Sequence, residues 1–290
     1  MVTELIIPHR AAGQGRYFTR KIQNIVTDHY GVQYRATCIP CDLFSMCETE
    51  KLLNSAEAIL YFSPYLNTAG LTQGRESDLE LICADNLSYA AEKAGVKQII
   101  YLRGAGDYQH SLEIKQTLCS RQLKVQELLL ETDVVAALKD HKSFGGKNRT
   151  VRSVQRFRLP NGKRAAWAAR EYGNWLARSL HPFGRVDISP EGDMGFYAKG
   201  IPRPLLVLSF SPERSWNERM LYYITGGLLA KAEGASTGRL EFREVLGGSA
   251  LVVAIHDYMP ALPWPLYCST QALIHLWVMT GFGRYLQNHA

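Results

Sequence analysis

Short apolar runs alternate with segments of helical periodicity through the first half of the chain, and this alternation constrains the fold more than any other feature. Strands are predicted at residues 5–7, 33–38, 58–62, 96–102 and 125–130. Helices are predicted between them at residues 17–29, 78–94 and 110–121. Because parallel strands need a long crossover connection, usually a helix, this order predicts βαβ units and a parallel sheet with right-handed crossovers.

The second half of the chain has a less regular pattern. We predict a helix at residues 165–180, short strands over 185–197, a strand at 205–210 and a helix at 214–231. A hairpin over 239–246 and 250–258 turns at Gly247 and Gly248, and a helix over 266–286 closes the chain. The whole pattern predicts an α/β protein with a compressed Rossmann-like parallel sheet followed by a small α+β C-terminal region.

The composition is that of an ordinary folded protein. The chain has 290 residues, 46% hydrophobic content and a net charge of +6, which is enough for a large core. The opening residues carry an acid and a short apolar run, so we expect no secretory signal, and no apolar stretch is long enough to span a membrane. Six cysteines are too few for a disulfide scaffold, and we expect a cytoplasmic protein.

Two segments carry a resemblance to a known family. They read A-I-L-Y-F-S-P-Y-L from residue 58 and D-N-L-S-Y-A-A-E-K-A-G-V-K-Q-I-I-Y-L-R-G from residue 85. They resemble the atypical and extended branch of the short-chain dehydrogenase superfamily, which includes NmrA-like and epimerase/dehydratase-like proteins. The likeness covers roughly residues 1–200 and implies a degenerate NAD(P)-binding domain there. Residues 201–290 then form an α+β domain, which resembles an uncharacterised bacterial domain often fused behind such proteins.

The predicted phosphate loop departs from the family. It reads P-H-R-A-A-G-Q-G over residues 8–15, and glycines are needed there for a tight turn and for approach of the backbone to a pyrophosphate. The resemblance implies that Arg10, Gly13, Gly15 and Arg16 lie at the phosphates and that Asp42 lies near an adenine. A tight strand-to-helix turn without a ligand is the alternative.

The ribose and catalytic positions depart as well. The chain between residues 31 and 40 is too short for a strand, a helix and a second strand, so we expect the ribose-binding strand end to be missing, with Arg35 the one candidate there. Arg103 stands where the family has a catalytic hydroxyl. Tyr108 lies seven residues before Lys115, where the family has a spacing of four, but His110 and Lys115 resemble the His and Lys of some atypical members. Tyr108, His110 and Lys115 are therefore the acid/base candidates if the protein is an enzyme. The alternative is that they are polar residues on an exposed helix.

Four other groups of residues are candidates for a binding or structural role. Residues 139–170 hold ten Lys/Arg and one acid, which suits a phosphate, a nucleic acid or an acidic partner, although a solvated loop is the commoner explanation and no DNA-binding motif is present. Cys38 and Cys41 have a metal-like spacing, but no second pair accompanies them and we expect no metal. His256 can pair with Glu241 or Glu244 across a hairpin. A corner of Pro and aromatic residues at 260–267 can pack, line an apolar pocket, touch a membrane or seal a homodimer.

Three functional hypotheses follow. The first is an enzyme that acts on a small, apolar metabolite by non-redox acid/base chemistry, with no cofactor or an unknown one. The second is an NADP-dependent oxidoreductase, as the family resemblance implies. The third is a non-catalytic ligand sensor or scaffold of the NmrA-like kind.

Overall fold

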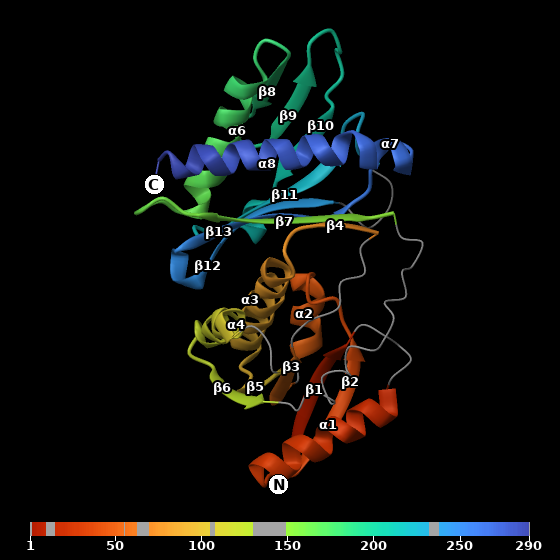
Figure 1. Ribbon diagram of the computed structural model, residues 1–290, viewed down its shortest axis with the longest axis vertical. Helices are drawn as coiled ribbons and strands as arrows, with labels where there is room; N and C mark the ends of the chain where they lie inside the picture. The colour runs from red at the N-terminus through yellow and green to blue at the C-terminus, as the bar shows by residue number, and fades with distance from the viewer. Residues whose placement is uncertain are drawn as a thin grey trace. The chain divides into compact units, whose positions relative to one another are not determined.

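The computed structural model describes residues 2–9, 15–54, 56–62, 70–104, 108–129, 149–231 and 238–289 (Figure 1). The chain divides into two compact units, each with its own sheet. Unit 1 consists of Met1–Thr68 and Leu79–Phe144, and unit 2 of Ala69–Asp78 and Gly145–Ala290. Residues 145–200, which the sequence analysis grouped with the N-terminal domain, therefore belong to the second unit.

The sheet of unit 1 is parallel throughout. Its order is β2-β1-β3-β5-β6. The strands are β1 (Thr3–His9), β2 (Tyr34–Pro40), β3 (Ala58–Phe62), β5 (Gln98–Arg103) and β6 (Lys124–Leu129). β1 pairs with β2 on one side and with β3 on the other. The prediction of an α/β protein with a Rossmann-like parallel sheet is confirmed.

Crossover handedness explains where the helices of unit 1 lie. They are α1 (Gly15–Tyr30), α2 (Met46–Leu53), α3 (Glu76–Ala94) and α4 (Tyr108–Cys119). The chain steps one way from β1 to β2 and the opposite way from β2 onwards, so right-handed crossovers place α1 on one face and the later helices on the other. Val26 of α1 packs with Leu60 on the first face, and on the second the Tyr61 hydroxyl donates to the Glu80 carbonyl of α3 at 3.3 Å.

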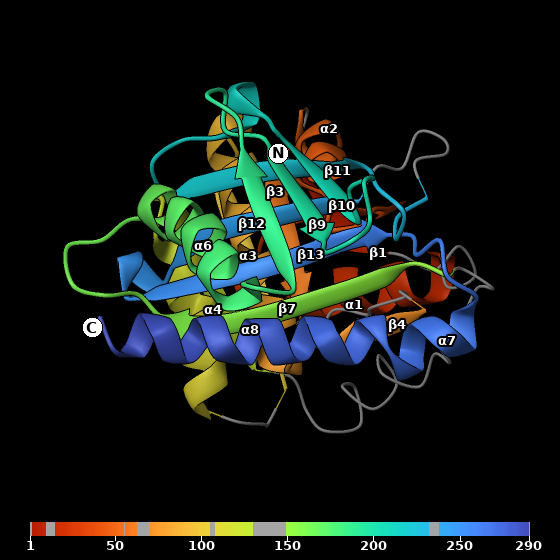
Figure 2. The ribbon, with the colours of Figure 1, turned by 90° about the horizontal axis from the view of Figure 1, so that it is seen from above.

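Unit 2 contains a larger and mostly antiparallel sheet. Its order is β4-β7-β13-β12-β11-β10-β9-β8, and β4 pairs with β7 in parallel. Its strands are β4 (Leu71–Gln73), β7 (Val151–Arg158), β8 (Gly184–Ile188), β9 (Met194–Ala198), β10 (Leu206–Phe210), β11 (Arg219–Gly226), β12 (Arg239–Val245) and β13 (Ala250–Tyr258). Its helices are α6 (Ala165–Leu180), α7 (Trp264–Ser269) and α8 (Gln271–Gln287), and α8 runs beside β7 (Figure 2).

Several predictions for the second half of the chain are corrected. The helix predicted at 214–231 is wrong: residues 219–226 form β11, in which Met220, Tyr222 and Ile224 alternate with residues of the other face. That period of two belongs to a strand. The predicted loop after residue 150 is also wrong, because residues 151–158 form β7 at the centre of the basic segment. The closing helix is interrupted at Thr270, which separates α7 from α8.

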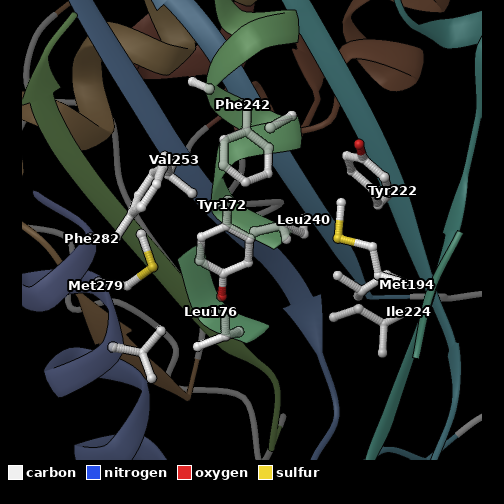
Figure 3. Packing of buried hydrophobic residues seen from close by; sticks show 14 of the residues in the cluster. Tyr172, Leu176, Met194, Tyr222, Ile224, Leu240, Phe242, Val253, Met279 and Phe282 are labelled. Atoms are coloured by element: carbon white, nitrogen blue, oxygen red, sulfur yellow. The ribbon is translucent and has the colours of Figure 1, made fainter. Parts of the chain in front are cut away.

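Aromatic side chains fill the core of unit 2. Tyr172 and Leu176 of α6 and Phe282 of α8 pack in one cluster with residues from the strands, such as Phe242 (Figure 3). The ring centroids of Tyr172 and Phe282 are 5.1 Å apart in an edge-to-face contact, and Phe242 of β12 lies 5.4 Å from Tyr172. Such pairs stabilise a core beyond the area that they bury. The two helices are therefore held on one face of the sheet by the same aromatic cluster.

Replacement of Phe282 tests this packing. Phe282→Ala removes a fully buried ring and leaves a cavity, and we expect a loss of about 3–5 kcal/mol in the free energy of unfolding. All five tryptophans lie in unit 2, so tryptophan fluorescence during urea unfolding reports this unit. The control is Phe183→Ala, whose ring is 78% exposed and whose effect is expected within about 0.5 kcal/mol. Equal effects of the two substitutions would contradict the assigned core.

Candidate functional site

The strand order of unit 1 reverses between β1 and β3, which is the point where open sheets of this kind form a ligand-binding crevice. In open α/β sheets ligands bind outside the carboxyl ends of the strands at such a point, which here lies between β1 and β3. The predicted phosphate loop follows β1 at this place. Gly15 and Arg16 are the first two residues of α1, whereas Arg10 and Gly13 lie outside the described residues.

The end of β2 corrects one expectation. The strand end that we expected to be missing is present, since β2 pairs with β1 along its whole length and Pro40 stands opposite His9. Asp42 follows two residues later, at the same edge as the crevice. Its carboxylate accepts from the backbone N–H of Phe44 at 3.2 Å, in the turn that leads to α2. Among the described residues, the sheet of unit 1 has no strand beyond β2, but it does have the strand next to β1.

Arg35 is at the wrong edge of the sheet for a phosphate in this crevice. It is the second residue of β2 and stands opposite Glu4, at the amino ends of the strands. There it lines a small polar cavity of about 320 Å³ with Gln23, Asn24 and Thr27. Arg35 is thus separated from the carboxyl edge by the length of a strand.

A single carboxylate brings two of the predicted catalytic residues together. Arg103 ends β5 and Glu127 lies on the neighbouring strand β6, with both side chains on the face that α4 covers. The Arg103 Nε–H donates to Glu127 Oε1, and Lys115 Nζ of α4 donates to Glu127 Oε2 at 2.7 Å. Glu127 therefore binds one cation with each oxygen. Sequence reasoning missed it, although an acid inside the apolar strand pattern Val125–Leu129 was a usable signal.

The pKa directions in this cluster agree with its geometry. Hydrogen bonding to Glu127 raises the pKa of Lys115, against a smaller lowering by burial. Burial acts to raise the pKa of Glu127, but the hydrogen bonds from Lys115 and Arg103 together bring it below its ordinary value. The charged forms of Lys115 and Glu127 are thus favoured near neutral pH. Lys115 is held as a cation and is not available as a base.

His110 forms a separate pair with a buried acid. Its Nε2 lies within hydrogen-bond distance of Oε2 of Glu80, which is almost fully buried on α3. Because a carboxylate only accepts, Nε2 carries the hydrogen when Glu80 is ionised. Glu80 is the second functional candidate that sequence reasoning missed. A His–carboxylate pair of this kind can hold or move a proton at the imidazole ring.

Tyr108 stands apart from both groups. It is the first residue of α4, its side chain is 65% exposed, and its hydroxyl makes no hydrogen bond to any residue that the structure describes. Tyr108 and Lys115 are two helical turns apart, about 10 Å along the helix axis. The structure therefore does not bring these two residues together.

Unit 2 contains a buried network of charges centred on Glu241. Its carboxylate accepts hydrogen bonds from Arg219 of β11 and from Arg243, which lies on β12 like Glu241 itself. His256 Nε2 of β13 lies 3.6 Å from the same carboxylate. Burial acts to raise the pKa of Glu241, but the two guanidinium groups hold it well below its ordinary value. Burial lowers the pKa of His256. Of the two acids that the sequence offered as partners of His256, the structure places Glu241 beside it. The charge of the Glu241 carboxylate is compensated mainly by the two arginines.

The basic segment is partly built into unit 2. Arg152 and Arg156 lie on β7, where Arg156 binds Asp78 at 2.9 Å and Arg152 lies 3.7 Å from Asp257. Arg152 is almost completely buried. Residues 151–158 of the segment are therefore not a solvated loop, whereas residues 161–164 form an exposed turn and residues 139–148 lie outside the described part of the chain.

The described residues contain no group of three or more His, Cys, Asp or Glu arranged to hold a metal ion, and Cys38 and Cys41 are free thiols. No helix in this part of the chain is long and apolar enough to cross a membrane.

A polar cavity of about 510 Å³ in unit 2 is lined by Arg75, Gln155 and Arg156 among others.

Comparison with known proteins gives one sequence relative. No family model matches the chain. The auxiliary protein GraX of Staphylococcus aureus (strain NCTC 8325 / PS 47) is 27% identical over 257 residues, which cover 85% of this chain and 78% of GraX. The likeness extends through both units, and at this identity it marks GraX as similar without defining a shared family.

Solved structures with detectable likeness include proteins of the nucleotide-binding class. A nucleoside-diphosphate-sugar epimerase from Staphylococcus aureus matches with a TM-score of 0.32 and 11% identity, covering 44% of this chain and 50% of that one. The triphenylmethane reductase of Citrobacter sp., complexed with NADP(H), matches with a TM-score of 0.29 and 16% identity, covering 46% and 52%. The chain spans about half the length of these two structures. The fold assignment rests on the sheet topology and not on these low scores.

Proposed function

We propose that this chain is an auxiliary ligand-binding protein, in which unit 1 binds a small phosphate-bearing molecule at the crevice between β1 and β3 and transfers no hydride. The observation that carries the proposal is that Glu127 pairs with both Arg103 and Lys115. These contacts occupy Lys115, the cation that a dehydrogenase-like reaction would use, and Arg103, which stands in place of the catalytic hydroxyl.

The requirements of hydride transfer explain why this pairing is decisive. In the family that the sequence resembles, a lysine beside a tyrosine lowers the tyrosine pKa so that the hydroxyl can act as an acid. Here Lys115 is bound to Glu127, and Tyr108 is exposed and two helical turns away. Arg103 replaces the catalytic hydroxyl at the end of β5 and cannot give up its proton. None of the three groups is arranged for that reaction.

Ligand binding is supported by different features. The crevice between β1 and β3 is the place where sheets of this order bind ligands, and the start of α1 directs backbone N–H groups towards an anion there. Arg16 adds a positive charge to the first turn of α1. Asp42 follows β2 at the same edge, where an acid can accept from ribose hydroxyls. The description of GraX as an auxiliary protein suits a binding role.

A second candidate function is non-redox acid/base chemistry, and the pair of His110 and Glu80 favours it. The carboxylate fixes the orientation of the imidazole ring, as a positioned general base requires. The proposal of an apolar substrate has less support, because the cavities described above are lined mainly by polar residues. If this second function is correct, the protein converts a substrate, and His110→Gln abolishes that conversion.

Nucleotide titration tests the main proposal. We expect NADPH to bind, as read by its nicotinamide fluorescence, and Arg16→Gln to weaken binding at least about tenfold because a charge-assisted contact to phosphate is lost. Arg35→Gln is the matched control, since Arg35 lies at the opposite edge of the sheet, and we expect no change. Absence of binding by NADPH and by ADP would contradict the binding site. Oxidation of NADPH with a carbonyl acceptor, lost in Lys115→Met, would contradict the absence of hydride transfer.

The ion-pair cluster also predicts a pH-dependent stability difference. The folded-state pKa of Glu127 is lowered from 4.5, so its stabilisation is present above that value and is lost as the pH falls through the folded pKa. Glu127 is only 24% exposed, and we expect Glu127→Gln to cost about 1–2 kcal/mol at pH 7. The difference from wild type should shrink below pH 4.5.

Hydrogen exchange measures this difference in unit 1. Protein equilibrated in urea at each pH is pulse-labelled, and the peptides that contain β5 and β6 are followed. The control is Glu4→Gln at an exposed position, for which we expect a change within about 0.5 kcal/mol. A Glu127→Gln variant as stable as wild type at pH 7 would show that the cluster does not hold its charges in the folded state.

A further inference from the structure

Helix α8 is apolar on its outer surface as well as on its inner one. Met279, Phe282 and Leu286 are buried in the core of unit 2. Leu273, Ile274 and Trp277 are exposed at 58%, 60% and 65%. A surface helix normally carries polar side chains on its outer side, and a helix that is apolar all round is normally buried. The outer side of α8 therefore lacks a partner among the described residues.

The exposed apolar residues form one patch. Residues three and four apart share a helix face, which places Leu273, Ile274 and Trp277 together, and Leu266 of the preceding helix α7 is also exposed. We call these four residues the α8 patch. The two helices that carry the patch contain little charge: residues 259–290 contain no Asp, Glu or Lys and a single arginine, Arg284.

The area of the α8 patch fits a dimer interface. Trp277 exposes about 150 Å², and the whole patch exposes on the order of 450 Å² of apolar surface. A standard interface removes about 800 Å² from each partner, of which somewhat more than half is apolar, or about 450 Å². The patch thus supplies the apolar part of one standard interface. Interface centres are also poor in charge and rich in tryptophan.

We propose that the α8 patch binds a second copy of this chain, with the two α8 helices packed antiparallel about a twofold axis near Ile274 and Trp277. A twofold axis brings the same surface of both copies together, so each Trp277 lies close to its counterpart. The neutrality of the patch permits this, because no acid or lysine meets its own copy. The inference is independent of the function proposed for unit 1.

The position of Arg284 agrees with this arrangement. If the axis passes between residues 274 and 277, each Arg284 lies about 13 Å from the axis along its helix, and the two arginines are about 25 Å apart. That separation exceeds the screening length of about 8 Å at physiological salt, so they do not repel. A membrane surface is a poorer occupant, since helices that lie on membranes carry many Lys and Arg on their polar side.

Sedimentation velocity of the full chain over about 1–100 μM tests the proposal. We expect wild type to dimerise and Trp277→Glu to raise the dissociation constant at least about 30-fold, as a central aromatic contact would. Phe183→Glu is the control, because Phe183 is also exposed but lies outside the α8 patch, and it should dimerise like wild type. The melting curve of each variant, followed by tryptophan fluorescence, checks that unit 2 is folded.

A charge-swap experiment makes the geometry specific. Trp277→Glu and Trp277→Lys should each be monomeric alone, and an equimolar mixture should form dimers, since residue 277 of one copy faces residue 277 of the other. A wild-type chain that stays monomeric at 100 μM would overturn the proposal. Dimers that persist in both single variants, or a mixture that stays monomeric while both variants are folded, would overturn the placement at α8.

Discussion

Strand β1 pairs in parallel with a neighbour on each side, and the organisation of unit 1 depends on that pairing. The chain leaves β1 in one direction to form β2 and returns past it to form β3. Because both crossovers are right-handed, α1 and the later helices fall on opposite faces. The strand order thus reverses between β1 and β3, and the carboxyl edge at such a point is where open α/β sheets bind ligands.

In the proposed function, Glu127 limits the chemistry that this edge of the sheet supports. A carboxylate with a guanidinium on one oxygen and an ammonium on the other is a stable arrangement in which each charge is compensated. It holds Lys115 in its protonated form and directs Arg103 along the sheet. The same residue types without Glu127 would leave two cations free to act on a ligand. The pair of His110 and Glu80 lies in the same unit.

Regular periodicity made much of the fold predictable. The strand at 58–62 and the helix at 165–180 have the predicted bounds, because the strand is a continuous apolar run that ends before Ser63-Pro64 and the helix has an apolar period that ends before Pro182. The region 214–231 failed because Tyr222 and Tyr223 are adjacent, so an apolar run there suits either period. β7 was missed because Arg152 and Arg156 make its sequence read as a solvated loop, whereas Asp257 and Asp78 lie beside these arginines in the folded chain.

The site was less predictable than the fold for the same reason. Arg103, His110 and Lys115 were identified from a family resemblance, but their partners Glu127 and Glu80 come from distant elements, and only tertiary structure shows which acid meets which base. Position along a strand mattered equally. Arg35 lies near the start of β2 and Asp42 follows its end, and the direction of the strand places only Asp42 at the edge where sheets of this order bind ligands.

The pKa of Lys115 in the folded protein tests the account most directly, because the proposed absence of hydride transfer depends on its ion pair with Glu127. Lysine methylene carbons labelled with ¹³C report this titration by NMR, and Lys115→Arg identifies the signal. We predict a pKa above the ordinary value of 10.5, which falls back towards that value in Glu127→Gln. A pKa for Lys115 near 7–8, the range of catalytic lysines, would contradict the account.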